Sequence, residues 1–91
     1  MDNLSVVIRN KNEARWIGYS IQSCLDNFKN PEIIIVDNNS TDESMQIVKE
    51  FCFSDIKTYN IDDYTPGKSL NLGVSKANNK NILILSAHSQ I

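Results

Sequence analysis

The chain has 91 residues, of which 41% are hydrophobic and 22% charged, with a net charge of −2 and a pI near 5.2. This composition is typical of one small globular domain, and its slight acidity argues against nucleic-acid binding, which normally needs a basic surface. No stretch approaches the ~20 apolar residues of a membrane-spanning helix and no signal peptide is recognisable, so we expect a cytoplasmic protein.

The first half of the chain alternates predicted strands and helices. Residues 4–8, Leu-Ser-Val-Val-Ile, form a strand that leads into a polar turn. Apolar residues then recur at helical spacing, which predicts a helix from about Glu13 to Asn27. Residues 33–36 are branched aliphatic residues in a row, a pattern typical of a parallel strand buried on both faces. Residues 40–43, Ser-Thr-Asp-Glu, match the capping-box pattern and predict a second helix from near Thr41.

The second half of the chain continues this alternation. Residues 56–60 form a weaker, mixed strand whose polar content suits the edge of a sheet. A third helix is predicted with Thr65 as its N-cap and Pro66 at the favoured first helical position. Its packed face is marked by Leu70, Gly73, Val74 and Ala77. Residues 82–85 then form another strand of doubly buried composition.

The element order β-α-β-α-β-α-β predicts an α/β protein with a three-layer Rossmann-like half-fold. Right-handed crossovers and a third strand at one edge give a parallel sheet of order 3-2-1-4. The first two helices then share one face of the sheet, and the third lies alone on the other. The fourth strand is left as an uncovered edge despite its apolar composition. We therefore expect either continuation into a larger protein or self-association along this strand.

Asp37 is the first candidate for ligand binding, because it directly follows the buried strand 33–36. Open α/β sheets bind ligands outside the carboxyl ends of their strands, and a predicted helix N-terminus follows this carboxylate. On position alone, the capping of a turn is the alternative role for Asp37.

Lys68 is the second candidate, because a cation in the first turn of a helix opposes the helix dipole at a cost of about 0.3–1 kcal/mol. A bound diphosphate would compensate for this cost, since backbone N–H groups and the ammonium would converge on one anion. An ion pair of Lys68 with Asp62 or Asp63 is the alternative.

Three segments of the chain resemble the donor half of family 2 glycosyltransferases of the GT-A fold. They are residues 6–8 followed by a polar turn and Glu13, residues 36–42 (Val-Asp-Asn-Asn-Ser-Thr-Asp), and residues 71–73 (Asn-Leu-Gly) before the last strand. The resemblance extends over essentially all 91 residues. The chain is most similar to a bacterial subset with Lys-Asn-Glu after the first strand, whose enzymes build surface polysaccharides.

The resemblance implies that residues 1–91 are a single domain, the N-terminal donor-binding part of such an enzyme. It implies a nucleotide-sugar donor and a saccharide or lipid-linked acceptor, and association with the membrane in the full-length enzyme. In the family, the catalytic base and the acceptor-binding half lie beyond the position of Ile91. We therefore assign no catalytic residue and expect nucleotide binding without turnover by the chain alone.

The resemblance also implies roles for residues of the first two turns. Asn10 and Asn12 would line the nucleoside pocket, Glu13 would support the first turn, and Asp37 would accept a hydrogen bond from the N–H of a pyrimidine base. A carboxylate is a specific acceptor for such a group. Ordinary turn formation is the alternative for the two asparagines, and a favourable charge in the first helical turn is the alternative for Glu13.

A divalent metal, Mn²⁺ or Mg²⁺, is the cofactor that the family would imply. Its members hold the ion with an Asp-X-Asp motif at the end of the fourth strand, where this chain has Ser86-Ala87-His88. The single imidazole of His88 is a poor ligand for Mg²⁺ and a tolerable one for Mn²⁺. A hydrogen bond from His88 to phosphate, or no role for this near-terminal residue, are the alternatives.

A non-enzymatic α/β module, of the receiver or flavodoxin-like kind, is the alternative function, since a fold does not determine a function. A phosphoryl receiver needs acidic residues after its first strand, and a flavin-binding module needs a phosphate-binding loop there. This chain has Arg-Asn-Lys-Asn at residues 9–12 instead.

Overall fold

The structure, a computed structural model, describes residues 4–51, 55–62 and 66–87. Its elements in chain order are β1 (Leu4–Asn10), α1 (Ile17–Asn27), β2 (Glu32–Asp37), α2 (Ser44–Lys49), β3 (Ile56–Asn60), α3 (Pro66–Lys76) and β4 (Asn81–Ser86). The strands pair in parallel in the order β3-β2-β1-β4, which confirms the predicted sheet. Asp63, Thr65 and His88, to which the sequence assigns candidate roles, lie outside the described residues.

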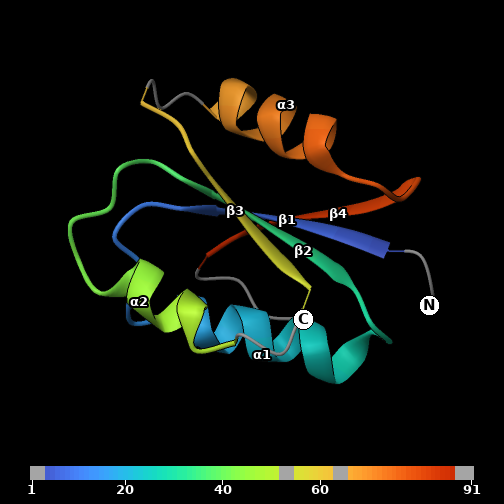
Figure 1. The fold of residues 1–91 in the computed structure, drawn as a ribbon, viewed down its shortest axis with the longest axis horizontal. Helices are drawn as coiled ribbons and strands as arrows, with labels where there is room; N and C mark the ends of the chain where they lie inside the picture. The colour runs from blue at the N-terminus through green and yellow to red at the C-terminus, as the bar shows by residue number, and fades with distance from the viewer. Residues whose placement is uncertain (1–3, 52–54, 63–65, 88–91) are drawn as a thin grey trace.

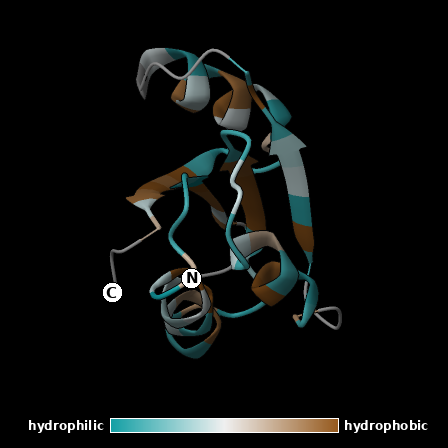
Figure 2. Cartoon of the chain, turned by 90° about the vertical axis from the view of Figure 1, so that its left-hand side faces the viewer, coloured by the Kyte–Doolittle hydropathy of each residue, from teal (hydrophilic) through white to brown (hydrophobic). Residues whose placement is uncertain are grey.

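Helices cover both faces of the sheet, α1 and α2 on one side and α3 on the other (Figure 1). Because successive side chains of a strand point to opposite faces, each strand contributes to both cores. Val6, Ile8, Ile33 and Ile35 pack toward α1 and α2, whereas Val7, Ile34 and Val36 form the core on the α3 side. Figure 2 shows the hydrophobic colouring running along the strands, with mostly hydrophilic connections. The predicted three layers are confirmed.

Gly73 allows α3 to lie close to the sheet. A Cβ atom at this position would be 2.3 Å from Cγ1 of Val7 and 3.3 Å from Cγ2 of Val36, so a larger residue would push the helix outward. Asn78, just after α3, bonds to Glu32 at the start of β2. The helix therefore runs antiparallel to the strands, and its first turn lies at their carboxyl ends.

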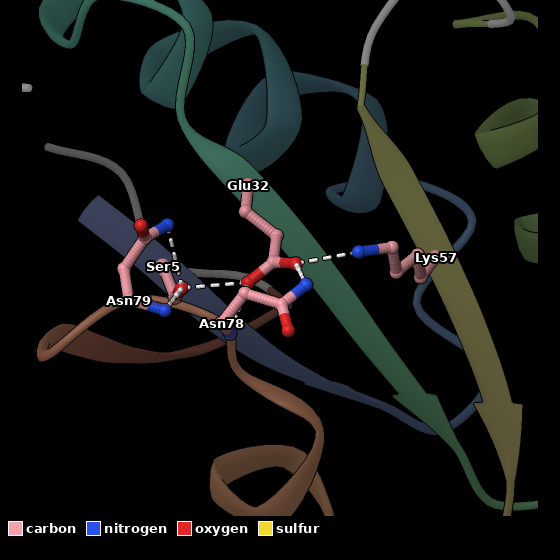
Figure 3. Close-up of polar contacts among 5 residues, drawn as sticks. All are labelled: Ser5, Glu32, Lys57, Asn78 and Asn79. Atoms are coloured by element: carbon pink, nitrogen blue, oxygen red, sulfur yellow. Dashed lines mark hydrogen bonds and ion pairs between the residues drawn. The ribbon is translucent and has the colours of Figure 1, made fainter. Parts of the chain in front are cut away.

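A cluster of polar side chains joins the amino ends of the strands (Figure 3). Glu32 Oε1 accepts hydrogen bonds from Ser5 Oγ at 2.7 Å and from the backbone N–H of Asn78 at 2.8 Å. Its Oε2 accepts from Lys57 Nζ at 2.6 Å and Asn78 Nδ2 at 2.7 Å. Burial alone would raise the pKa of Glu32, but these bonds lower it to about 2. Glu32 thereby connects β1, β2 and β3 with the α3–β4 loop.

The predicted starts of the first two helices are too early. Helix α1 begins at Ile17, after a turn in which the Glu13 carbonyl accepts from the N–H groups of Trp16 and Ile17. Helix α2 begins at Ser44, and the capping box does not form, because the Ser40 hydroxyl accepts from the N–H of Asn12 and donates to Asp37. Contacts with a neighbouring strand end thus prevail over a local capping pattern.

The strand β4 lies at the edge of the sheet and is incompletely covered. Ile84, on its α3 side, is 45% exposed, and Val74 of α3 is 40% exposed. The predicted packing of Val74 is therefore wrong, and Leu72 packs against the core in its place. No helix in the described part of the chain is long and apolar enough to cross a membrane.

Candidate functional site

The carboxyl ends of β1 and β2 bring Asn10 and Asp37 together as paired residues in the sheet. Both side chains lie on the face that α1 and α2 cover, because they continue the alternation of Ile8 and Ile35. Asn10 is fully buried, and Asp37 is 6% exposed. A cavity of about 280 Å³ borders Asp37 and is lined by Asp37, Met45, Thr58, Tyr59 and Asn60.

The Asp37 carboxylate is held by hydrogen bonds within the protein. Its Oδ1 accepts from Asn10 Nδ2 at 2.8 Å and from Ser40 Oγ at 2.6 Å. Its Oδ2 accepts from the backbone N–H of Ser40 at 3.0 Å. Because a carboxylate offers about four acceptor positions, these contacts leave one on Oδ2 for a further donor. Asp37 is thus an oriented acceptor at the rim of a small cavity.

Asn10 does not line the cavity but donates a hydrogen bond to the Asp37 carboxylate. Its Nδ2 also lies 2.9 Å from Ser44 Oγ and 3.2 Å from Ser40 Oγ, which links β1 to the start of α2. Its Oδ1 is buried without a hydrogen-bond partner. The serines were missed by the sequence interpretation, which assigned Ser40 to a local cap and gave Ser44 no role.

Asn12 connects the loops that follow β1 and β2. Its backbone adopts a left-handed conformation with a φ of 52°, which asparagine tolerates better than most residues. Its Oδ1 accepts from the N–H groups of Thr41 at 2.7 Å and Asp42 at 3.3 Å, and its own N–H donates to Ser40 Oγ. Asp42 Oδ2 in turn accepts from the N–H of Ala14 at 3.0 Å. These bonds fix the loop that follows Asp37.

Two further residues predicted from the sequence to bind the ligand, Glu13 and Lys68, lie outside the strand that carries Asp37. Glu13 begins the turn before α1, where its backbone carbonyl accepts from the N–H groups of Trp16 and Ile17. Lys68 is exposed in the first turn of α3, on the opposite face of the sheet from Asp37 but at the same carboxyl edge. The structure therefore brings Asn10, Asn12 and Asp37 together and places Lys68 across the edge from them.

The described residues supply no metal site at this edge. No group of three or more His, Cys, Asp or Glu side chains that could hold an ion occurs among them. Ala87 is buried and has no ligating side chain, and its carbonyl accepts a hydrogen bond from Ser20. No carboxylate thus stands at residues 86 and 87, where the family's metal motif would begin, and we derive no chemical step through a metal.

A larger hollow, of about 550 Å³, lies at the opposite edge of the sheet. It is lined by Gln22, Leu25, Asp26, Phe28, Asn30, Pro31 and Asp55. Pro31 and Asp55 directly precede β2 and β3, so the hollow is at the amino ends of the strands, where open α/β sheets do not usually bind ligands. None of the sequence-predicted residues lies there, and the smaller cavity beside Asp37 remains the candidate site.

Two curated proteins are similar to the chain over nearly its whole length. The dolichyl N-acetyl-alpha-D-glucosaminyl phosphate 3-beta-D-2,3-diacetamido-2,3-dideoxy-beta-D-glucuronosyltransferase of Methanococcus voltae is 30% identical over 98% of the chain. An uncharacterized glycosyltransferase of Rickettsia bellii is 31% identical over 92% of it. The chain spans 30% and 12% of the lengths of these relatives. They do not favour the receiver or flavodoxin alternative.

The fold has a counterpart in the crystal structure of TarS from S. aureus. The two superpose with a TM-score of 0.89 at 24% identity, over 98% of this chain and 28% of the TarS chain. Another TarS structure contains UDP-GlcNAc. The decisive finding is a match of residues 5–91 to the family described as Glycosyl transferase family 2. The chain belongs to this family of glycosyltransferases.

Proposed function

We propose that the chain is the donor-binding part of a glycosyltransferase and binds a nucleoside diphosphate sugar at the carboxyl ends of β1 and β2. The observation that carries this proposal is the geometry of Asp37, which lines the cavity and whose internal bonds orient it and leave one acceptor position on Oδ2. A base N–H would donate to that position. The UDP-GlcNAc complex of TarS supports a donor of this class.

The size of the cavity suits only part of such a donor. At about 280 Å³ it lies below the ~300 to 1,000 Å³ typical of small-molecule sites, so it can take a base while the rest of the ligand extends along the edge. Asn10 and Asn12 hold the Asp37 loop, Glu13 supports the first turn, and Lys68 receives the diphosphate. The hydrogen bonds of Asn10 with Asp37 and of Asn12 with Thr41 support the role of the two asparagines. The position of Lys68 in the first turn of α3 supports the last role.

The acceptor in this proposal is a saccharide or a lipid-linked sugar, in the synthesis of a surface polysaccharide. The name of the M. voltae relative, which includes a dolichyl-linked sugar phosphate, supports an acceptor of this kind. A metal contributes little to donor binding, because residues 86–88 offer only the imidazole of His88 and the weakly ligating hydroxyl of Ser86.

Substitution of Asp37 tests this function. In Asp37→Asn the charge is lost while the size is kept, so UDP should bind about tenfold or more weakly, as expected for one lost hydrogen bond to a charged group. Isothermal titration calorimetry measures the change. Asp26→Asn, an exposed carboxylate of α1, is the matched control and should bind UDP like the unmodified chain. Equal affinities of the Asp37 variant and the unmodified chain would contradict the proposal.

A further inference from the structure

Two buried polar atoms on the α3 side of the sheet have no hydrogen-bond partner. They are Nε of Arg9, at the carboxyl end of β1, and Oγ of Ser69, in the second turn of α3. Ser69 is only 1% exposed, and Arg9 is partly buried. Withdrawing an N–H donor or a hydroxyl from water without a partner is unfavourable. Such atoms call for an explanation.

The topology places these residues at the same level of the structure. Arg9 follows Val7 by two residues on the same face of β1, about 6.6 Å farther toward the carboxyl edge. Ser69 precedes Gly73 by four residues on the sheet-facing side of α3, about 6 Å along the helix axis. Because α3 runs antiparallel to β1 and Gly73 contacts Val7, both steps lead in the same direction. Arg9 and Ser69 are therefore placed at the same level, where the first turns of α3 cover the end of β1.

The chemistry of this place suits an anion. Arginine offers several N–H donors in a fork that matches phosphate oxygens, and a serine hydroxyl adds another donor. Lys68, next to Ser69 in the chain, adds a second positive charge at the same helix start. Arg9 is also adjacent to Asn10, the residue that holds Asp37, so one ligand can reach across the sheet edge from Asp37 to Arg9.

We propose that Arg9 and Ser69 form an anion-binding subsite that takes the phosphate groups of the donor. The proposal rests on the proposed function for its ligand, and it adds residues from the opposite face of the sheet. The buried Nε of Arg9 has no partner within the described part of the protein. Among the residues that the structure describes, no hydrogen bond or ion pair of the Arg9 side chain is found.

The test separates phosphate from base recognition by titrating the chain with UDP, uridine and pyrophosphate. In Arg9→Gln we expect UDP to bind about tenfold or more weakly and pyrophosphate binding to be lost, with uridine unaffected. Ser69→Ala should weaken UDP binding by a smaller factor, because a neutral donor is lost. Arg15→Gln, at an exposed arginine just before α1, is the matched control and should leave all affinities unchanged.

Each outcome is decisive. Unchanged UDP and pyrophosphate affinities in Arg9→Gln would overturn the subsite, while UDP binding that depends on Asp37 would leave the proposed function intact. Pyrophosphate binding that requires Arg9, in a chain that does not bind UDP, would support the subsite and contradict the proposed function. Equal losses of uridine and UDP binding in Arg9→Gln would overturn the subsite too, because Arg9 would then not act on the phosphates. Chemical denaturation of Arg9→Met should show undiminished stability, whereas a marked loss would assign Arg9 a structural role and overturn the proposal.

Discussion

At the scale of single residues, two buried carboxylates differ in how their acceptor positions are used. Glu32 accepts four hydrogen bonds, from Ser5, Lys57 and twice from Asn78, so all of its about four positions are filled. Asp37 accepts three and borders a cavity. Filled acceptors indicate a structural carboxylate, and the position left on Asp37 indicates a binding one.

The structural role of Glu32 predicts a specific dependence of stability on pH. Its pKa is lowered from 4.5 to about 2 in the folded chain, so its contribution is fully present above pH 4.5 and is lost as the pH falls toward 2. Glu32→Gln should lower the free energy of unfolding at pH 7 by about 1.5–3 kcal/mol. In this variant the free energy of unfolding should also decrease less between pH 4.5 and pH 2 than it does in the unmodified chain. Urea denaturation at several pH values measures both effects, and an unchanged pH profile would contradict this role.

Asp37 was predictable from the sequence, whereas Glu32 was not. Asp37 ends an uninterrupted apolar strand, and local sequence alone shows this. The partners of Glu32 are 25 to 46 residues away along the chain, and only the sheet order and the return of α3 bring them to it. The roles of Ser40 and Ser44 were missed for the same reason, because their contacts with Asn10 span 30 and 34 residues.

At the scale of the elements, the closeness of α3 to the sheet depends on Gly73. Alanine there would gain about 1 kcal/mol of helix propensity but would overlap Val7, and overpacking a core costs about 1–3 kcal/mol. We expect Gly73→Ala to be destabilising by about 1 kcal/mol in urea denaturation. Gly67→Ala, in the same helix with no atom within 4 Å of the added group, is the matched control. Equal stabilities of the two variants would contradict the close packing.

The types and order of the elements were predictable, but helix ends and one packed face were not. Apolar runs and helical periodicity predicted every strand and helix, and crossover handedness predicted their arrangement. The start of α2 was predicted too early because Ser40 bonds to Asp37 rather than capping the helix. Val74 was assigned to the core because the sequence cannot tell how far α3 extends over β4.

At the scale of the whole molecule, β4 presents an apolar strand at the edge of the sheet. Such edges pair readily with other strands, and we propose that two copies of the chain associate along it. Ile84→Lys would place a charge on this edge and should shift the chain toward monomer in sedimentation velocity. Tyr19→Lys, at another exposed hydrophobic residue, is the matched control. A monomeric unmodified chain at high concentration would contradict the association.

We propose that a nucleoside diphosphate binds at the carboxyl ends of β1 and β2. NMR spectroscopy of the ¹⁵N-labelled chain titrated with UDP tests it most directly, because each backbone amide reports on its own surroundings. The largest shifts should occur around Asn10, Asp37 and Ser40, and along the cavity at Tyr59 and Asn60. The absence of shifts, or shifts confined to the hollow around Gln22 and Asp55 at the other edge, would contradict it.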